Sequence, residues 1–172
     1  IQTLILCPTR ELCIQIANDL VTYSRYLKKI NILAVYGGAR IDRQIKSLKK
    51  YPQIIVGTPG RTKDLIKRKK LSLNHIDRLI LDEADEMLSM GFKDDLESIF
   101  MKTAKDKQVL LFSATMTPKV NEVTKKYMKG PLKIAASRVN LAADNVEHVS
   151  YMVQAKDRYE AVKRIADMNP NI

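Results

Sequence analysis

The sequence predicts an α/β fold in which a parallel sheet is flanked by helices on both faces. Short, continuous apolar runs alternate along the chain with longer runs whose apolar residues recur at helical spacing. Continuous apolar runs are typical of strands buried on both faces, and parallel strands need helical crossovers between them. Ligands of such sheets bind beyond the carboxyl ends of the strands, so the turns that follow the strands are where chemistry is expected.

The elements follow one another in a regular order. We expect strands at residues 3–7, 32–36, 54–56, 79–81, 109–112 and 132–135. We expect helices at residues 9–28, around 41–48, from 59 onward, at 93–104 and at 118–127. Thr58 is the expected N-cap of the third helix because Pro59 fits the first helical position.

The domain organisation is predicted from a change in composition after residue 136. Residues 1–136 form the first domain, and the polar, small residues of 137–146 form a linker. Residues 147–172 predict the start of a second domain, with a strand at 148–153 and a helix at 158–168.

Composition and charge limit the possible partners. The 172 residues carry 30 Lys+Arg against 19 Asp+Glu, a net charge of +11. This excess favours a polyanionic partner such as nucleic acid, although solvated helix ends rich in lysine would give the same composition. No apolar run approaches the ~20 residues of a membrane span. We therefore expect a cytoplasmic protein with no membrane partner, in which Cys7 and Cys13 are reduced thiols.

Two carboxylates follow directly after the strand at 79–81. Asp82 and Glu83 would therefore lie at the carboxyl edge of the sheet. Asp82 can hold Mg²⁺ through its water shell, and Glu83 can orient and deprotonate an attacking water. The alternative is a helix N-terminus that carries acids because the helix dipole favours them.

The residues around these acids resemble a known family. Leu81-Asp82-Glu83-Ala84-Asp85-Glu86-Met87-Leu88, with Gly91-Phe92 after it, resembles motif II of the DEAD-box RNA helicases. The resemblance implies that Asp82 and Glu83 are catalytic and that Asp85 contacts Ser113 or Thr115, coupling hydrolysis to the rest of the protein. Met87 and Met90 are expected to pack in the core.

Four further segments resemble motifs of the same family, in the family's order. They are Pro8-Thr9-Arg10-Glu11-Leu12 (motif Ia), Gly37-Gly38 with Gln44 downstream (the glycine doublet), Thr58-Pro59-Gly60-Arg61 (motif Ib) and Ser113-Ala114-Thr115 (motif III). One departure is Thr62, where the family usually has an aliphatic residue, and we expect looser packing there.

These turns are suited to contact with a nucleic-acid backbone. Glycines allow phosphates to approach the main chain, and helix N-termini offer free N–H donors. Arg10 and Arg61 can add charge-assisted bonds, with the alternative that one of them ties the motifs together. The predicted RNA contacts are phosphate and 2′-OH, with little sequence preference. Taken singly, each segment is better explained by turn chemistry or a helix start, but five such sites in the family's order reverse that judgement. The predicted RNA-binding residues are Pro8, Thr9, Arg10, Gly37, Gly38, Thr58, Pro59, Gly60 and Arg61.

The resemblance implies a RecA-like fold of the P-loop NTPase type and an ATP-dependent RNA helicase that uses ATP and Mg²⁺. Segments such as residues 87–92 resemble those of bacterial cold-shock or ribosome-assembly helicases. None of the six glycines begins a Gly-Lys-Ser/Thr sequence, so the first strand and the P-loop are expected to lie upstream. We therefore expect the 172-residue chain alone to be inactive and to bind ATP poorly. A non-enzymatic RNA-binding scaffold and a DNA helicase of the same superfamily are the alternatives.

Overall fold

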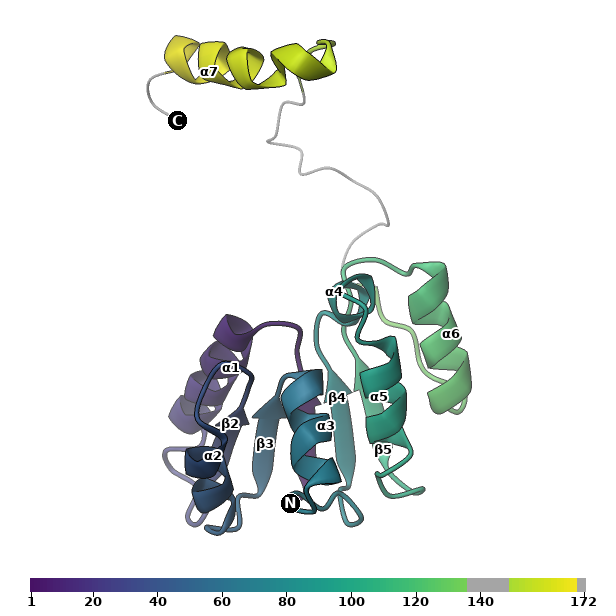
Figure 1. Cartoon of the computed structure of the whole chain (residues 1–172). Coiled ribbons are helices and arrows are strands. Elements are labelled where there is room, and N and C mark those ends of the chain that lie inside the picture. The colour runs from purple at the N-terminus through teal and green to yellow at the C-terminus, as the bar shows by residue number, and fades with distance from the viewer. Residues whose placement is uncertain (136–148, 170–172) are drawn as a thin grey trace. The chain divides into compact units, whose positions relative to one another are not determined.

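A five-stranded, wholly parallel sheet forms the centre of the first part of the chain (Figure 1). The computed structural model describes residues 1–135 and 149–169. The strand order is β2-β3-β1-β4-β5. The strands are β1 (Thr3–Leu6), β2 (Ile32–Val35), β3 (Ile54–Gly57), β4 (Arg78–Leu81) and β5 (Gln108–Leu111). Five of the six strands expected in residues 1–136 are therefore confirmed, as is the predicted α/β class.

Helices cover both faces of the sheet because the central strands are apolar on both sides. In β1, Leu4 and Leu6 belong to one buried cluster, and Ile5 belongs with Cys7 to the other. The smaller cluster is closed by α1 (Arg10–Tyr23), which lies behind the sheet in Figure 1. The larger cluster is closed by α2 (Ile41–Leu48), α3 (Pro59–Lys67), α4 (Ala84–Ser89), α5 (Lys93–Phe100) and α6 (Pro118–Tyr127).

The first helix ends earlier than the prediction of residues 9–28. Helix α1 stops at Tyr23, and the hydroxyl of Ser24 donates to the carbonyl oxygen three residues before it. Tyr23 and Leu27 continue the apolar periodicity but are exposed, so they have no core to pack against. Lys29 then has a φ of 67°, a left-handed conformation that turns the chain toward β2.

The two cysteines are free thiols, buried between α1 and the sheet. The Cys13 thiol donates to the carbonyl oxygen of Val56 at 3.2 Å. A hydrogen bond with Cys13, together with burial, raises the pKa of the Cys7 thiol. Both side chains act as small apolar groups of the core.

Other predictions also differ from the structure, and the helix expected at 93–104 ends at Phe100. Residues 132–135 form no strand, because Leu132 and Ile134 are exposed and lie beside no strand of the described chain. In the predicted strand 148–153, residue 148 lies outside the described residues, and 149–153 form no strand, with exposed side chains. Met87 is buried as expected, but Met90 is half-exposed because it follows the last turn of α4.

The chain divides into two compact units, Ile1–Pro131 and Leu132–Ile172. In the second unit, a short 3₁₀ turn (Ala155–Asp157) leads into α7 (Arg158–Met168), which matches the predicted helix. The predicted domain limits at 136 and 147, and the linker 137–146, lie outside the described residues and stay predictions. Among the described residues, no helix is long and apolar enough to cross a membrane.

Candidate hydrolytic and RNA-binding edge

The five turns that carry the sequence motifs start at one level of the sheet. The last residues of the five strands lie in mutual register, in the order Val35, Gly57, Leu6, Leu81 and Leu111. The motifs therefore follow one another along the carboxyl edge: the glycine doublet, motif Ib, motif Ia, the acidic motif and motif III. This edge lies at the upper end of the strands in Figure 1. The acidic motif occupies one half of it, and the predicted RNA contacts occupy the other.

The acidic pair lies where β4 leaves the sheet. The backbone N–H of Asp82 donates to the carbonyl oxygen of Leu6 at 2.9 Å, which extends the sheet ladder one residue beyond the strand. The Asp82 carboxylate accepts the N–H of Glu83 at 3.1 Å. Glu83 is exposed and left-handed, with φ 51° and ψ 53°. Such strained backbone is uncommon outside glycine and concentrates at functional sites. The turn presents two neighbouring carboxylates at the edge of the sheet.

Asp85 connects the acidic motif to motif III. Its carboxylate accepts both the backbone N–H of Thr115 at 2.9 Å and the Thr115 hydroxyl at 2.7 Å. The Ser113 hydroxyl donates to the carbonyl oxygen of Thr115 at 2.7 Å, which supports this loop. Partial burial raises the pKa of Asp85, but the hydrogen-bond donors of Thr115 and the neighbouring Ser113 hydroxyl outweigh this and hold the pKa below its usual value.

Motif Ia forms the start of α1, in the middle of the edge. The Thr9 hydroxyl oxygen accepts the N–H of Leu12 at 3.2 Å, which makes Thr9 the N-cap and leaves its O–H free to donate. Arg10 is exposed, and its guanidinium lies 5.2 Å from the centre of the Tyr36 ring. Pro8 is buried. The buried Pro8 side chain therefore shapes the turn, and its predicted contact with RNA stays a prediction.

Motif Ib and the glycine doublet are joined by one arginine. Both terminal nitrogens of Arg61 donate to the carbonyl oxygen of Ala39, each at 3.1 Å. The Arg61 guanidinium therefore ties motif Ib to the glycine loop, which is the alternative role expected for one of the two arginines, and its contact with RNA stays a prediction. Thr58 occupies the N-cap position of α3, but its side chain makes no capping hydrogen bond, so its hydroxyl is available. Pro59 is buried and has the same shaping role as its counterpart in motif Ia.

The glycines of these two turns leave room above the main chain. A Cβ atom placed on Gly37 would meet nothing within 4 Å, and one on Gly60 would meet only a carboxylate oxygen at 3.6 Å. Gly38 has a φ of 79°, which favours glycine. Neither Gly37 nor Gly60 is required by close packing, so their open backbone gives a phosphate group access to the main chain.

Comparisons with known proteins identify the family to which these motifs belong. The family model for the DEAD/DEAH box helicase matches residues 1–123. The chain belongs to this family. Among curated proteins, it is 45% identical over 168 residues to the ATP-dependent RNA helicase CshA of Listeria monocytogenes, covering 98% of this chain and 32% of that protein. It is 41% identical over 169 residues to the ATP-dependent RNA helicase DeaD of Mycobacterium tuberculosis, covering 98% and 30%.

Solved structures give the same result for the fold of this DEAD/DEAH-family chain. A DEAD box protein from the hyperthermophile Methanococcus jannaschii has a TM-score of 0.74 and 43% identity, over 96% of this chain and 44% of that one. An ATP-dependent RNA helicase, described as hypothetical, from Sulfolobus tokodaii has a TM-score of 0.71 and 35% identity, over 76% and 39%. The chain thus spans about a third of the curated relatives it matches.

Sequence reasoning missed the glycine at the end of β3. A Cβ atom on Gly57 would lie 2.3 Å from the Thr62 hydroxyl oxygen and 2.9 Å from a Val35 methyl carbon. Gly57 therefore lets the first turn of α3 close against β2 and β3. The position just before the motif Ib threonine was the available signal. Thr62, noted in the sequence as a departure, is fully buried, and its hydroxyl has no hydrogen-bond partner in the described chain.

The acidic half of the edge in this DEAD/DEAH-family chain fits a magnesium ion. Mg²⁺ retains most of its waters and is usually held by one or two carboxylates together with substrate phosphates. Asp82 at a strand end offers a carboxylate of this kind, and residues 1–135 and 149–169 contain no group of three or more metal-binding side chains. These residues do not provide a binding site for the triphosphate of a nucleotide, because none of them forms the glycine-lysine loop that would hold it.

Proposed function

We propose that the chain supplies the water-activating acids and part of the RNA-binding surface of an ATP-dependent RNA helicase. The observation that carries this proposal is the level carboxyl edge, which places Asp82 and Glu83 beside the open turns of motifs Ia and Ib. The printed names of the relatives, which are ATP-dependent RNA helicases, support the same assignment.

Each acidic residue has a separate role in the proposed reaction. Bound Mg²⁺ and ATP supply the metal ion and the phosphoryl group. Asp82 would hold the Mg²⁺ ion through its water shell, and Glu83 would orient the attacking water and accept its proton. Asp85 holds motif III through Thr115, so a movement of that loop changes the position of the acids. Proton transfer by a positioned base contributes roughly 10²–10⁴ to a rate.

RNA contacts are assigned to the other half of the edge. Thr9, Thr58 and the exposed Arg10 offer donors, and the backbone above Gly37 and Gly60 is open. All of these groups suit phosphate and ribose oxygens. Binding of this kind has little sequence preference and distinguishes RNA from DNA through the 2′-OH.

The test is a chimera in which these 172 residues replace the matching third of the Listeria relative. We expect RNA-stimulated phosphate release from ATP, and a loss of at least ~100-fold on Glu83→Gln. Glu86→Gln is the matched control, because Glu86 is an exposed acid on the same helix that only meets Ser89. The 172-residue chain alone should release no phosphate above an Asp82→Asn control.

The alternatives give different outcomes in the same assay. A chimera that binds RNA but hydrolyses no ATP would favour the non-enzymatic scaffold. Stimulation by single-stranded DNA as strong as that by RNA would favour a DNA helicase of the same superfamily. Equal activity of the Glu83→Gln and Glu86→Gln variants would contradict the assigned base.

A further inference from the structure

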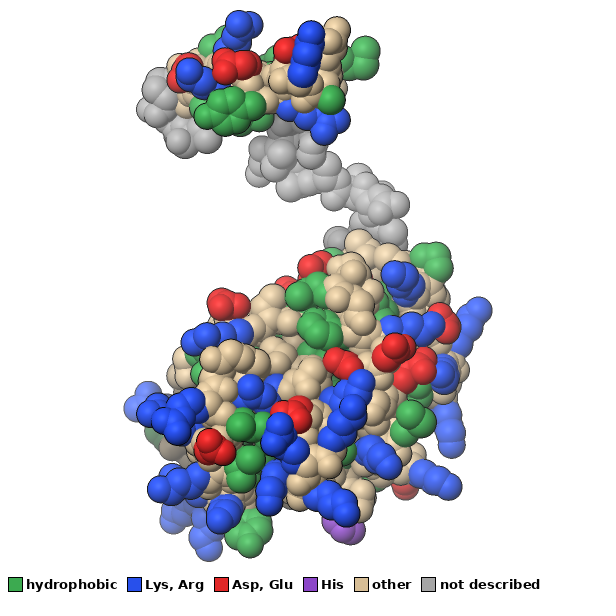
Figure 2. Space-filling model, in the orientation of Figure 1, with side chains coloured by type: hydrophobic (Ala, Val, Ile, Leu, Met, Phe, Trp, Pro, Cys, Tyr) green, Lys and Arg blue, Asp and Glu red, His purple; other side chains and the backbone are tan. Residues whose placement is uncertain are grey.

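Most of the net positive charge of the chain lies in one quarter of its length, and the carboxyl edge uses only part of it. Residues 20–63 contain ten Lys and Arg and a single Asp, a net charge of +9 out of the +11 of the whole chain. Figure 2 shows Lys and Arg side chains crowded over the lower and left margins of the first unit. The preference of lysine for helix C-termini explains single cations, but it does not explain a net charge of +9 within 44 residues.

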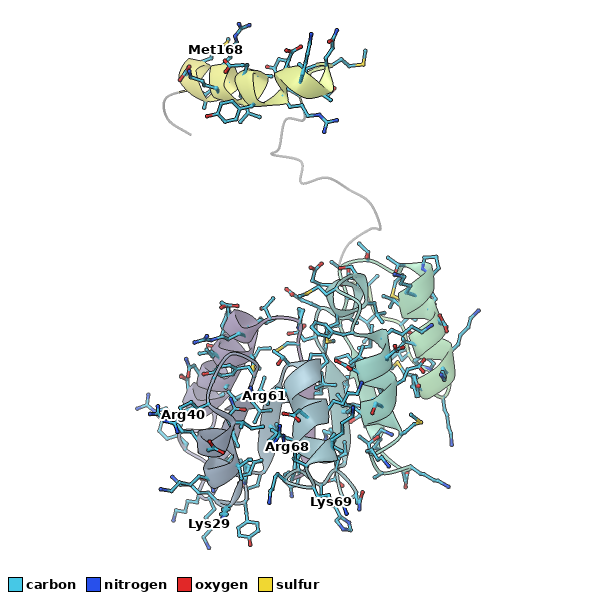
Figure 3. The ribbon with its side chains drawn as sticks, viewed as in Figure 1. Lys29, Arg40, Arg61, Arg68, Lys69 and Met168 are labelled. Carbon is cyan, nitrogen blue, oxygen red and sulfur yellow. The ribbon has the colours of Figure 1, made fainter. Side chains whose placement is uncertain are left out.

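Five of these ten cations lie where α1 and α2 return to the sheet. The two connecting loops, residues 24–31 and 49–53, lie at the amino ends of β2 and β3. We call the exposed cations and rings of these loops the amino-edge patch: Tyr26, Lys28, Lys29, Lys49, Lys50 and Tyr51. Figure 3 places Lys29 at this lower margin. Within residues 1–135 and 149–169, none of the four lysines forms an ion pair.

One side chain fixes the two loops against each other. The side-chain oxygen of Gln53 (Oε1) accepts the backbone N–H of Asn31 at 2.7 Å. The side-chain nitrogen of Gln53 (Nε2) donates to the backbone carbonyl oxygen of Tyr51 at 3.0 Å. The backbone N–H of Gln53 also donates to the carbonyl oxygen of Asn31 at 3.0 Å. The patch is therefore a formed surface whose two halves keep their spacing.

The rings of the patch are unusually open to solvent. Tyr26 is 82% exposed and Tyr51 is 83% exposed. The Arg25 guanidinium lies 4.9 Å from the centre of the Tyr26 ring, which leaves the other face of the ring free. Tyr51 has a φ of 52°, a left-handed position at the end of α2 that glycine or asparagine normally occupies. A bulky residue is strained there, and burial of the ring does not offset the strain.

Flat rings among unpaired lysines match one kind of ligand. Lysines attract a polyanion, and exposed aromatic rings stack with unpaired bases. A duplex hides the faces of its bases, so it cannot stack on these rings as a single strand can. The four-residue strands separate the patch from the carboxyl edge by about 13 Å, so the same nucleotides cannot occupy both places.

We propose that the amino-edge patch is a second binding surface for single-stranded RNA, separate from the carboxyl edge. The proposal rests on the proposed function in one respect, namely that RNA is the nucleic acid concerned. RNA held at this surface stays attached to the protein while the carboxyl edge releases it. The consequence is a longer residence of the protein on single-stranded than on double-stranded RNA.

The test uses the 172-residue chain and a labelled, single-stranded oligouridylate of about 20 nucleotides, with affinity measured by fluorescence anisotropy. We expect Tyr51→Asn to weaken binding roughly tenfold. Asparagine is favoured at a left-handed position, so this loss cannot come from unfolding. Replacing both Lys49 and Lys50 by glutamine should reduce the slope of log K against log salt concentration by about 1.4, since each phosphate contact contributes about 0.7.

Matched controls separate the patch from general charge and from the carboxyl edge. Lys102→Gln with Lys105→Gln removes two exposed cations from the same margin, and Tyr159→Asn removes an equally exposed ring from α7. Both should bind as the unaltered chain does. Unchanged binding by Tyr51→Asn, or equal binding of a duplex, would overturn the proposal. If Arg10→Ala alone abolishes binding, the patch fails and the proposed function stands. If the patch variants weaken binding but the chimera lacks ATPase activity, the proposed function fails and the patch stands.

Discussion

Replacing Thr62 by valine should stabilise the first unit. The Thr62 side chain has 0% exposure, and its hydroxyl has no hydrogen-bond partner among the described residues. A buried, unpaired hydroxyl costs about 1–3 kcal/mol, and valine has nearly the same shape with a methyl group in its place. The hydroxyl oxygen lies against the main chain of Gly57, since a Cβ atom placed there would come within 2.3 Å of it. We expect a gain of about 1–2 kcal/mol in the free energy of unfolding.

The assay is equilibrium unfolding in urea with a parallel thermal scan. For a unit of this size, the gain corresponds to a rise in Tm of roughly 3–6 °C. Thr124→Val is the matched control, because the Thr124 hydroxyl is also buried but donates to the carbonyl oxygen of Val120 at 2.9 Å. The control should be neutral or slightly destabilising. The reasoning is refuted if the two substitutions have the same effect, since only one of them removes an unpaired hydroxyl.

Three further predictions use the same unit. Gly57→Ala should lower the free energy of unfolding by about 1–3 kcal/mol through overpacking, and adding Thr62→Ala should restore part of it; additive effects in urea unfolding would contradict the contact. The lowered pKa of Asp85 stabilises the folded state fully above the unfolded-state pKa of about 3.9, and this stabilisation is lost as the pH falls through the folded-state pKa. Thr115→Val should therefore make the urea midpoint less dependent on pH in this acidic range. An unchanged pH dependence would refute the assignment. Arg61→Lys should weaken RNA affinity at the carboxyl edge by roughly threefold to tenfold, because a lysine cannot make the paired contact; anisotropy equal to that of the unaltered chain would show that the pairing is dispensable.

The sequence allowed the strands and the motif order to be predicted, because both depend on local pattern. Apolar runs placed β1 to β5 within about two residues, and the motifs fell at the turns after them. The left-handed conformation of Glu83 depends on how β4 joins α4, and a single sequence does not express it. Residues 132–135 have strand-like composition, but a strand needs a partner ladder that pattern alone cannot supply.

The roles of single residues at the site were predicted less well than its position. Asp85 was expected to meet Ser113 or Thr115, and only the structure distinguishes the two. Arg10 and Arg61 were both expected to offer charge-assisted bonds to phosphate, with the alternative that one of them ties two motifs together. In the structure Arg61 has that second role, because its partner is the carbonyl oxygen of Ala39 in a loop 22 residues away. A contact to a backbone atom does not depend on the residue type of the partner, so the sequence cannot predict it.

The contact between Arg61 and Ala39 also affects how tightly RNA can bind. A loop that is ordered only when its ligand arrives loses conformational entropy at that moment, and the affinity falls by the same amount. Because a two-pronged hydrogen bond already fixes the glycine loop beside α3, that ordering takes place when the chain folds. The open main chain at Gly37 and Gly60 is thus rigid before any phosphate reaches it, and association can be fast as well as tolerant of sequence.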